Sequence, residues 1–123
     1  MAAHSASPHP HGDAYCGVDF GTSGARCFVV DADGQTLAAA KTPYASDEPE
    51  QRGDAWSSAL FSLLRGLPAD VKARVASLAI DGTSATTLLL DAATGALLQP
   101  PKLYNEAQDA AIVQLVKVID LPP

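Results

Sequence analysis

The chain has 123 residues, of which 47% are apolar and 18% are charged, and its formal net charge is −6. This length corresponds to about one globular domain, which can bury a hydrophobic core without metal or disulfide support. The acidic balance offers no basic surface to a nucleic acid backbone. No run approaches the roughly 18 apolar residues of a membrane span. Composition therefore predicts a small globular domain and argues against nucleic acid and membrane partners.

Residues 1–13 are rich in proline and small residues and contain few large apolar groups. Such a segment cannot offset the entropy of ordering, so we expect a disordered N-terminal tail. It lacks the basic and apolar regions of a secretion signal, and the first basic side chain is Arg26, which is atypical of a transit peptide. We therefore expect a cytoplasmic location, with a plastid location left open. His4, His9 and His11 would lack the supporting groups that orient metal ligands, so no metal site is expected there.

Three strands in succession are predicted after this tail. Residues 15–20 form an apolar run, the small residues 21–24 follow as a turn, and residues 26–31 form a second β-rich run. A second turn at residues 32–34 leads into a weaker strand over Thr36–Thr42. The pattern predicts three consecutive antiparallel strands.

The chain contains two cysteines, Cys16 and Cys27. A turn centred near Ser23 places Cys16 opposite Val30 and Cys27 opposite Asp19, an offset of about 10 Å along the strands. A disulfide requires Cα atoms within about 7 Å. We therefore expect two buried, reduced thiols.

Residues 43–53 are charged and contain two prolines, which is typical of a loop. Asp54 is a plausible N-cap for a helix that ends at Gly66 and Pro68. A short charged connector, 69–74, precedes a continuous apolar run over Val75–Asp81 that predicts a strand covered on both faces. The apolar face of the helix is expected to consist of Trp56, Leu60, Leu63 and Leu64.

The last third of the chain carries weaker signals. Small residues at 82–85 predict a loop, and residues 86–91 with 96–99 predict a hairpin. A helix is expected over 106–119. Together these elements indicate an α/β fold with a mixed sheet.

The turn Asp19–Arg26 is the strongest candidate for a binding site. A tight hairpin of small residues can direct successive N–H groups into one concavity, and such nests bind anions. Gly21 and Gly24 permit positive φ and close approach of a phosphate, while the hydroxyls of Thr22 and Ser23 can donate to its oxygens. Asp19 at the strand end could hold Mg²⁺ through water. The alternative is a plain hairpin turn; the spacing fits neither a Walker A loop nor a dinucleotide fingerprint.

A second candidate follows the predicted strand 75–81, where α/β sheets commonly bind ligands. It consists of Asp81, Gly82, Thr83 and Ser84. Ser84 also resembles a hydrolase nucleophile, but that role requires a following helix and a histidine partner, and every histidine lies in the tail. Hydrolysis is therefore disfavoured.

The order of these motifs resembles the start of FGGY carbohydrate kinases. The similarity rests on Gly17–Arg26, on Asp31–Gly34, on the helix that contains Asp54 and Trp56, and on Asp81–Thr86 with Asp91. The Asp-Gly-Thr-Ser-Ala-Thr loop is similar to the ribulokinase-like branch, which includes D-ribulose kinases and relatives of xylulokinase. The resemblance extends from about Tyr15 to Tyr104.

This resemblance implies a ribonuclease-H-like fold of the actin and hexokinase type, with two lobes that close on MgATP and a sugar. Asp19, Thr22, Ser23, the flanking Gly21 and Gly24, and Arg26 would face phosphate and metal, and Asp81–Ser84 would face the sugar. Residues near Glu50 would approach the sugar as well. The expected cofactors are ATP and Mg²⁺, with Asp19 as the metal-binding residue, and the expected reaction is phosphoryl transfer to a pentulose such as D-ribulose.

The departures from the family pattern matter as well. Residues 103–108 stand where relatives usually carry a Trp-x-Asp-x-Arg segment, and no family pattern is visible beyond Asp109. The general base and the adenosine lobe of such kinases are expected beyond Pro123. Residues 14–123 are therefore expected to be a truncated, incomplete N-terminal lobe that lacks turnover. The alternative is a non-enzymatic binding or interaction module, and exposed core could cause self-association.

Overall fold

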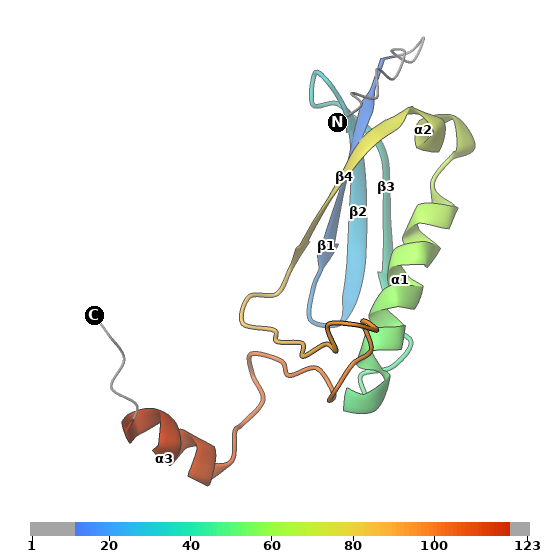
Figure 1. Cartoon of the computed structure of the whole chain (residues 1–123). Coiled ribbons are helices and arrows are strands. Elements are labelled where there is room, and N and C mark those ends of the chain that lie inside the picture. The colour runs from blue at the N-terminus through green and yellow to red at the C-terminus, as the bar shows by residue number, and fades with distance from the viewer. Residues whose placement is uncertain (1–11, 119–123) are drawn as a thin grey trace.

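A computed structural model describes residues 12–118 of the chain (Figure 1). The histidine-rich part of the predicted tail, where no metal site is expected, lies outside these residues, as does the end of the predicted last helix. The described elements, in chain order, are β1 (Ala14–Phe20), β2 (Gly24–Asp31), β3 (Thr36–Pro43), a 3-10 turn (Pro49–Gln51), α1 (Arg52–Gly66), α2 (Ala69–Arg74), β4 (Val75–Gly82) and α3 (Ala110–Val118).

The four strands form one mixed sheet in the order β3-β2-β1-β4. β1, β2 and β3 are joined by short turns and run antiparallel, whereas β4 pairs with β1 in parallel. A parallel pair needs a crossover, which α1 and α2 provide. The predicted mixed α/β sheet that begins with three antiparallel strands is therefore confirmed.

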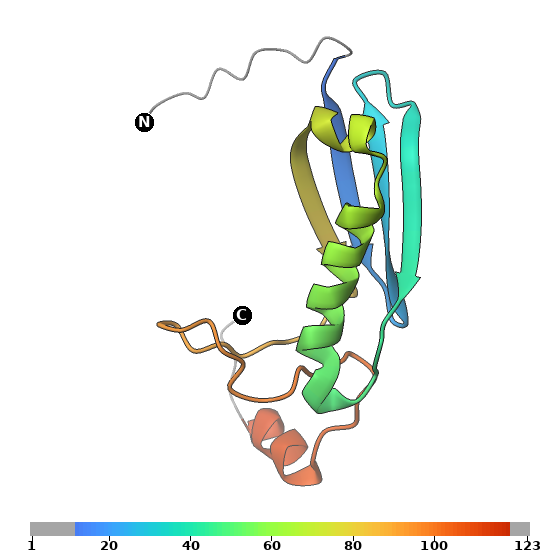
Figure 2. The same ribbon diagram turned by 90° about the vertical axis from the view of Figure 1, so that its right-hand side faces the viewer.

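One face of the sheet forms the hydrophobic core. Cys16 and Val18 of β1 and Cys27 and Val29 of β2 alternate onto this face and are at most 3% exposed. α1 lies along the same face (Figure 2). The predicted stripe is confirmed in part, because Leu63 is buried and Leu60 and Leu64 are partly buried and pack against the core. Arg52, Ala55 and Ala59 are buried as well, and the two small alanines let the helix approach the sheet closely.

The start of α1 also differs from the prediction. The helix begins at Arg52, so Asp54 lies inside its first turn, and Gln51 at the N-cap makes no side-chain capping bond. An acidic side chain in the first turn still interacts favourably with the helix dipole. Residues 69–74, predicted as a connector, form the short helix α2, which buries Val71.

The two cysteines are free and buried, as predicted. The predicted register was wrong by one position: Cys16 pairs with Val29, and Val18 with Cys27, because the turn is centred between Thr22 and Ser23. Burial raises the pKa of both thiols, and the neighbouring Cys27 raises that of Cys16 further. Both groups therefore remain protonated and unreactive at neutral pH.

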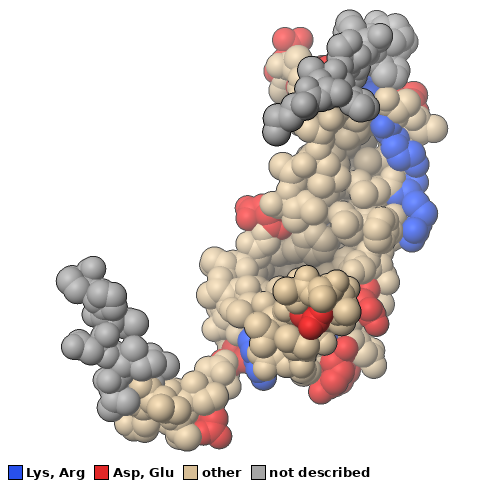
Figure 3. All heavy atoms as spheres, in the orientation of Figure 1, with Lys and Arg blue, Asp and Glu red and all other residues tan. Residues whose placement is uncertain are grey.

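β4 is not covered on both faces, which corrects the prediction made from its apolar run. It is an edge strand, and Leu78 and Ile80 are 41% and 56% exposed. α1 lies over β2 and β3, so the part of the same sheet face formed by β4 remains uncovered by the described residues. Figure 3, which looks onto the β4 edge of the sheet, shows a broad, mostly uncharged surface with a central hollow.

The predicted hairpin after β4 forms only in part. Isolated bridges pair Leu90 with Leu97 and Thr87 with Lys102, without regular strands. α3 begins at Ala110, later than predicted, and projects away from the sheet (Figure 1). Within residues 12–118, no helix has the length and apolar character needed to cross a bilayer.

Candidate functional site

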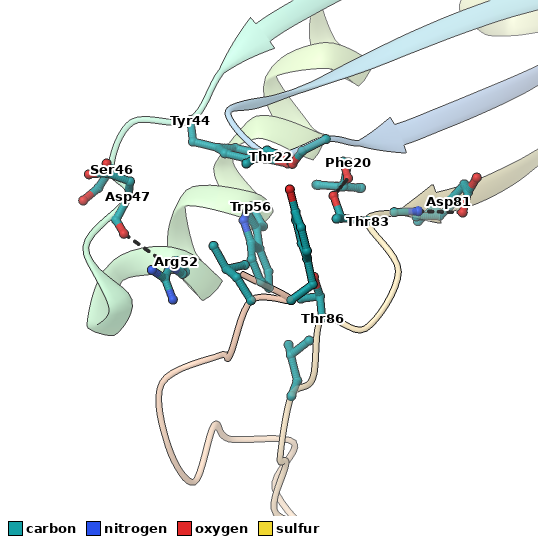
Figure 4. A pocket seen from close by; sticks show the side chains of 16 residues that line it. Phe20, Thr22, Tyr44, Ser46, Asp47, Arg52, Trp56, Asp81, Thr83 and Thr86 are labelled. Atoms are coloured by element: carbon teal, nitrogen blue, oxygen red, sulfur yellow. Dashed lines mark hydrogen bonds between the residues drawn. The ribbon is translucent and has the colours of Figure 1, made fainter. Parts of the chain in front are cut away.

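A cavity of about 460 Å³ lies at the end of the sheet where β1 and β4 terminate (Figure 4). Thr22 enters it from the β1–β2 turn, and Asp81, Gly82 and Thr83 enter it from the end of β4. The two loops singled out in the sequence therefore share one hollow. Its other walls consist of Phe20, Gly21, Tyr44, Ser46, Asp47, Arg52, Trp56, Ile80, Thr86, Leu88, Leu103 and Tyr104.

The β1–β2 turn is held by hydrogen bonds on both sides. The Gly21 N–H donates to the Gly24 carbonyl at 3.0 Å. From the segment after β3, the Tyr44 hydroxyl donates to the Gly21 carbonyl at 2.9 Å, and the Tyr44 N–H donates to the Ser23 carbonyl at 3.1 Å. The backbone of this turn is therefore fixed from outside as well as within.

The glycines of the turn are needed for space rather than for positive φ, which corrects the sequence interpretation. Gly21 and Gly24 are not among the positive-φ residues of the described chain. A Cβ at Gly24 would lie 2.5 Å from the Thr42 carbonyl oxygen, and one at Gly21 would lie 3.2 Å from the Gly24 oxygen. Close packing of the turn against β3 excludes a side chain at Gly24.

The loop after β4 is anchored to the end of β1. Thr83 donates to the Phe20 carbonyl twice, from its N–H at 3.0 Å and from its hydroxyl at 3.2 Å. The Asp81 carboxylate accepts the Gly82 N–H at 2.7 Å, as drawn in Figure 4. Ala85 then adopts a left-handed backbone with φ of 59°, a conformation that costs a non-glycine residue about 1 kcal/mol. The chain therefore turns beside the cavity, between Thr83 and Thr86, which both line it.

Asp19 and Asp81 lie in register on the parallel strands β1 and β4, and paired residues project to the same face of a sheet. This is the face opposite the core, and both residues line a second hollow of about 570 Å³ there. Arg26 forms an ion pair with Asp19: its Nε and its Nη2 each lie 2.7 Å from the Asp19 Oδ2. Ile80 and Asp81 border both hollows, so the two hollows meet at the end of β4.

The chemistry of these two side chains fits a magnesium ion. Mg²⁺ prefers oxygen ligands and is usually bound through one or two carboxylates, with water and substrate phosphates completing its coordination. One oxygen each of Asp19 and Asp81 is occupied by Arg26 and by the Gly82 N–H, which leaves the other oxygens for a cation. Within the described part of the chain, no group of three or more potential ligands is found.

The structure separates the predicted site residues into three sets. Gly21, Thr22, Asp81, Gly82 and Thr83 line the cavity, whereas Asp19 and Arg26 line the hollow on the other face. Ser23, Gly24 and Ser84 line neither. No helix begins directly after Ser84, which agrees with the argument against a hydrolase nucleophile.

Most residues of the cavity wall were not identified as site residues from the sequence, and Tyr44, Arg52 and Trp56 are the polar and aromatic ones that make the most specific contacts. The ring centroids of Tyr44 and Trp56 lie 6.5 Å apart at an interplanar angle of 59°, a favourable tilted arrangement. Trp56 was predicted only as part of a helix face. Tyr44 stood in a segment predicted as a loop, and an aromatic residue among polar ones was the only signal that could have marked it.

Arg52 connects α1 to the segment that follows β4. Its guanidinium donates to the carbonyls of Asp47 and Pro101 at 3.2 and 2.9 Å, and its Nη1 lies 2.6 Å from the Glu106 carboxylate. The Leu103 N–H and the Arg52 guanidinium lower the pKa of Glu106. This network holds Leu103 and Tyr104 in the cavity wall, because it fixes the backbone on both sides of them.

No protein-family model matches the sequence. Among the solved structures that share its fold are three kinases. A xyloylose kinase from Brucella ovis is 25% identical, with a TM-score of 0.58, and the match covers 75% of this chain and 21% of the kinase. A xylulose kinase from Lactobacillus acidophilus is 18% identical, with a TM-score of 0.60, and the match covers 85% of this chain and 22% of the kinase. A xylulose kinase from Rhodospirillum rubrum is 21% identical, with a TM-score of 0.64, and the match covers 87% of this chain and 24% of the kinase.

These likenesses confirm the fold class expected from the sequence, the ribonuclease-H-like fold of the actin and hexokinase type. The chain spans only between 21% and 24% of the length of the three kinases. Its fold therefore corresponds to one part of a sugar kinase.

Proposed function

We propose that the chain is part of the first lobe of an FGGY carbohydrate kinase of the ribulokinase-like branch, which transfers phosphate from ATP to a pentulose such as D-ribulose. The observation that carries this proposal is the cavity shared by the β1–β2 turn and the loop after β4. The kinase structures with the same fold support it.

In this proposal the β1–β2 turn binds the phosphates of ATP. Phosphoryl transfer depends on positioning and on charge stabilisation around the transferred group. The turn can supply hydroxyl and N–H donors, and Arg26 can supply positive charge beside them. Mg²⁺ would be held by Asp19, with Asp81 next to it, and would neutralise phosphate charge. The proposed phosphate-binding residues are Asp19, Gly21, Thr22, Ser23, Gly24 and Arg26.

The loop after β4 is proposed to face the sugar. The Asp81 carboxylate provides an acceptor for sugar hydroxyls, and the aromatic rings of Trp56 and Tyr104 supply apolar surface in the same cavity. The proposed sugar-binding residues are Asp81, Gly82, Thr83 and Ser84.

We assign no general base to this chain. Phosphoryl transfer requires ATP, metal and acceptor to be positioned together, and a cavity bounded by one part of a lobe cannot enclose all three. The isolated chain is therefore expected to bind ligand without turnover. Robust release of ADP that depends on D-ribulose would contradict this assignment.

Ligand titration of the purified chain, followed residue by residue by amide NMR shifts, tests the binding roles. MgATP should shift Thr22 and its neighbours, and D-ribulose should shift Gly82 and Thr83. Thr22→Val, which removes only the hydroxyl, should weaken MgATP binding about fivefold, the effect of one hydrogen bond. Thr36→Val, at an exposed site in β3, is the matched control and should not change it. Shifts confined to other regions would refute the proposal.

A non-enzymatic interaction module is the second candidate. The exposed apolar side chains of β4 and α3, among them Ile80 and Leu115 at 56% and 61% exposure, favour it. A chain that binds neither MgATP nor D-ribulose but co-purifies with a full-length kinase would support this candidate over the first.

A further inference from the structure

Tyr44 makes two contacts with the β1–β2 turn that differ from ordinary packing. Its hydroxyl donates to the Gly21 carbonyl at 2.9 Å, and its N–H donates to the Ser23 carbonyl at 3.1 Å. The residue is 23 positions away from Gly21 in the sequence and comes from the segment that leaves β3. A single residue therefore binds both carbonyls that flank the tip of the turn.

Binding a carbonyl also fixes the N–H of the next residue. In a trans peptide the C=O and the following N–H lie in one plane and point in opposite directions, and no cis bond occurs in the described residues. With the Gly21 carbonyl turned toward Tyr44, the Thr22 N–H must point away from Tyr44. Among residues 12–118, neither the Thr22 N–H nor the Ser23 N–H donates a hydrogen bond. Tyr44 therefore holds the Thr22 N–H, which is a free donor, in a set orientation.

The phenol itself is held in place. Its ring lies against the Trp56 ring, with centroids 6.5 Å apart, and Tyr44 is packed against the core. The hydroxyl keeps its proton well above neutral pH, because burial and then the nearby charge of Asp19 raise the pKa of Tyr44. Figure 4 shows Tyr44 beside Thr22 at the top of the cavity.

We propose that Tyr44 is a positioning residue for phosphate: its hydroxyl fixes the Gly21–Thr22 peptide plane so that the Thr22 N–H is preset to donate to a phosphate oxygen. This inference rests on the proposed phosphate-binding role of the turn. Without the hydroxyl, the peptide plane can rotate, and ordering it falls to the ligand, so affinity falls in addition to the stability lost with the hydrogen bond.

The test is Tyr44→Phe, which removes the hydroxyl and keeps the ring beside Trp56. Binding of inorganic tripolyphosphate with Mg²⁺ is followed by the amide shifts of Thr22 and Ser23, and stability by urea unfolding. We expect about fivefold weaker binding, the effect of one hydrogen bond, and a chemical shift change of the Thr22 amide in the free protein. Tyr15→Phe, the same change at the far end of β1, is the matched control. It should change neither the tripolyphosphate affinity nor the chemical shift of the Thr22 amide.

The outcomes separate this inference from the function on which it rests. If the wild-type turn does not respond to tripolyphosphate, the phosphate-binding role fails and the inference fails with it. If the wild type binds and Tyr44→Phe binds equally well, only the role of Tyr44 is refuted.

A second measurement applies if Tyr44→Phe does not fold. 3,5-Difluorotyrosine at position 44 keeps the ring and hydroxyl, but its phenol is more acidic than that of tyrosine. Tripolyphosphate affinity should fall in step with phenol ionisation, followed by ¹⁹F NMR, over a pH range in which the wild type is unchanged. An affinity that stays constant while the phenol ionises would overturn the proposal.

Discussion

The core strands and the edge strand β4 present paired residues to the same sheet face, yet these residues differ greatly in burial. Cys16 pairs with Leu78, and Val18 pairs with Ile80. The two β1 residues are 3% and 2% exposed, whereas the two β4 residues are 41% and 56% exposed. Strand register decides which face a side chain occupies, but only an overlying element buries it. α1 supplies that cover to β2 and β3, and β4 lacks it within the described residues.

The largest expected effect comes from removing core volume beneath α1. Leu63 is 2% exposed, so Leu63→Ala should lower the free energy of unfolding by about 2–5 kcal/mol, because it leaves a cavity in a packed core. Leu78→Ala, on the uncovered strand, makes the same chemical change. It should cost less than about 1 kcal/mol, since its side chain is already in contact with water.

Urea unfolding of both variants measures this difference directly. Equal losses for Leu63→Ala and Leu78→Ala would show that β4 is covered in solution. The contrast between the two parts of the sheet would then be wrong.

Self-association through β4 is the next expected effect. The outer edge of the strand is unpaired within the described residues, and Asp81 is its only charged residue. Antiparallel pairing of two β4 strands would therefore bring few like charges close to one another. We expect the molecular mass from light scattering to rise with concentration. Leu78→Lys should suppress the rise, since a charge on an edge strand opposes pairing, and a strictly monomeric wild type would contradict the prediction.

Loss of Arg52 should loosen the segment after β4 while leaving the core intact. Arg52→Ala removes the donors to Pro101 and to the Glu106 carboxylate. Amide exchange of Lys102 should become about tenfold faster, the effect of one charged hydrogen bond, and exchange in β2 should change little. Lys72→Ala, at an exposed site in α2, is the control. Uniform acceleration in both regions would mean that the network supports the whole fold.

The same network makes that segment sensitive to acid. The pKa of Glu106 is lowered in the folded chain by the Leu103 N–H and then by Arg52, so its contribution to stability is present above its ordinary pKa of 4.5 and is lost as the pH falls through the lower folded value. The protection of amides around Leu103, taken as exchange relative to the intrinsic rate at each pH, should therefore fall below pH 4.5. Glu106→Gln should flatten this dependence, and an unchanged slope would exclude Glu106 as its source.

The smallest effect is expected at Ala85. Its left-handed backbone is strained for alanine and not for glycine. Ala85→Gly should raise the free energy of unfolding by about 0.5 kcal/mol, since relief of strain exceeds the added freedom of the unfolded chain. Ala93→Gly, in the turn that follows Asp91, is the matched control and should not stabilise. A loss of stability at Ala85 would indicate another local conformation in solution.

Local patterns were sufficient to predict β1, β2, β3 and the position of both loops. Alternating apolar residues set the strand faces, and small residues marked the turns at Gly21–Gly24 and Gly82–Ala85. The register was wrong by one position because composition alone does not show where a turn is centred. The burial of β4 was wrong because an apolar run indicates that a strand can be covered, and not that an element covers it.

The partners of the site residues could not be predicted in the same way. Arg52 reaches Glu106 across 54 positions, and Tyr44 reaches Gly21 across 23. Neither pair leaves a periodic signal in the sequence, because each depends on how the crossover and the loops pack in space. The residues that line the cavity could therefore be identified only in the folded structure.

The parallel pairing of β4 with β1 has a consequence for how the chain folds. The two hairpins that join β1, β2 and β3 close locally, whereas Thr83 meets Phe20 only after 63 positions of intervening chain have been arranged. Contacts of long sequence separation form slowly, because the loop between them must be closed first. The β1–β2 turn is thus complete early in folding, and the hollow that it shares with Asp81 comes into existence only when β4 docks.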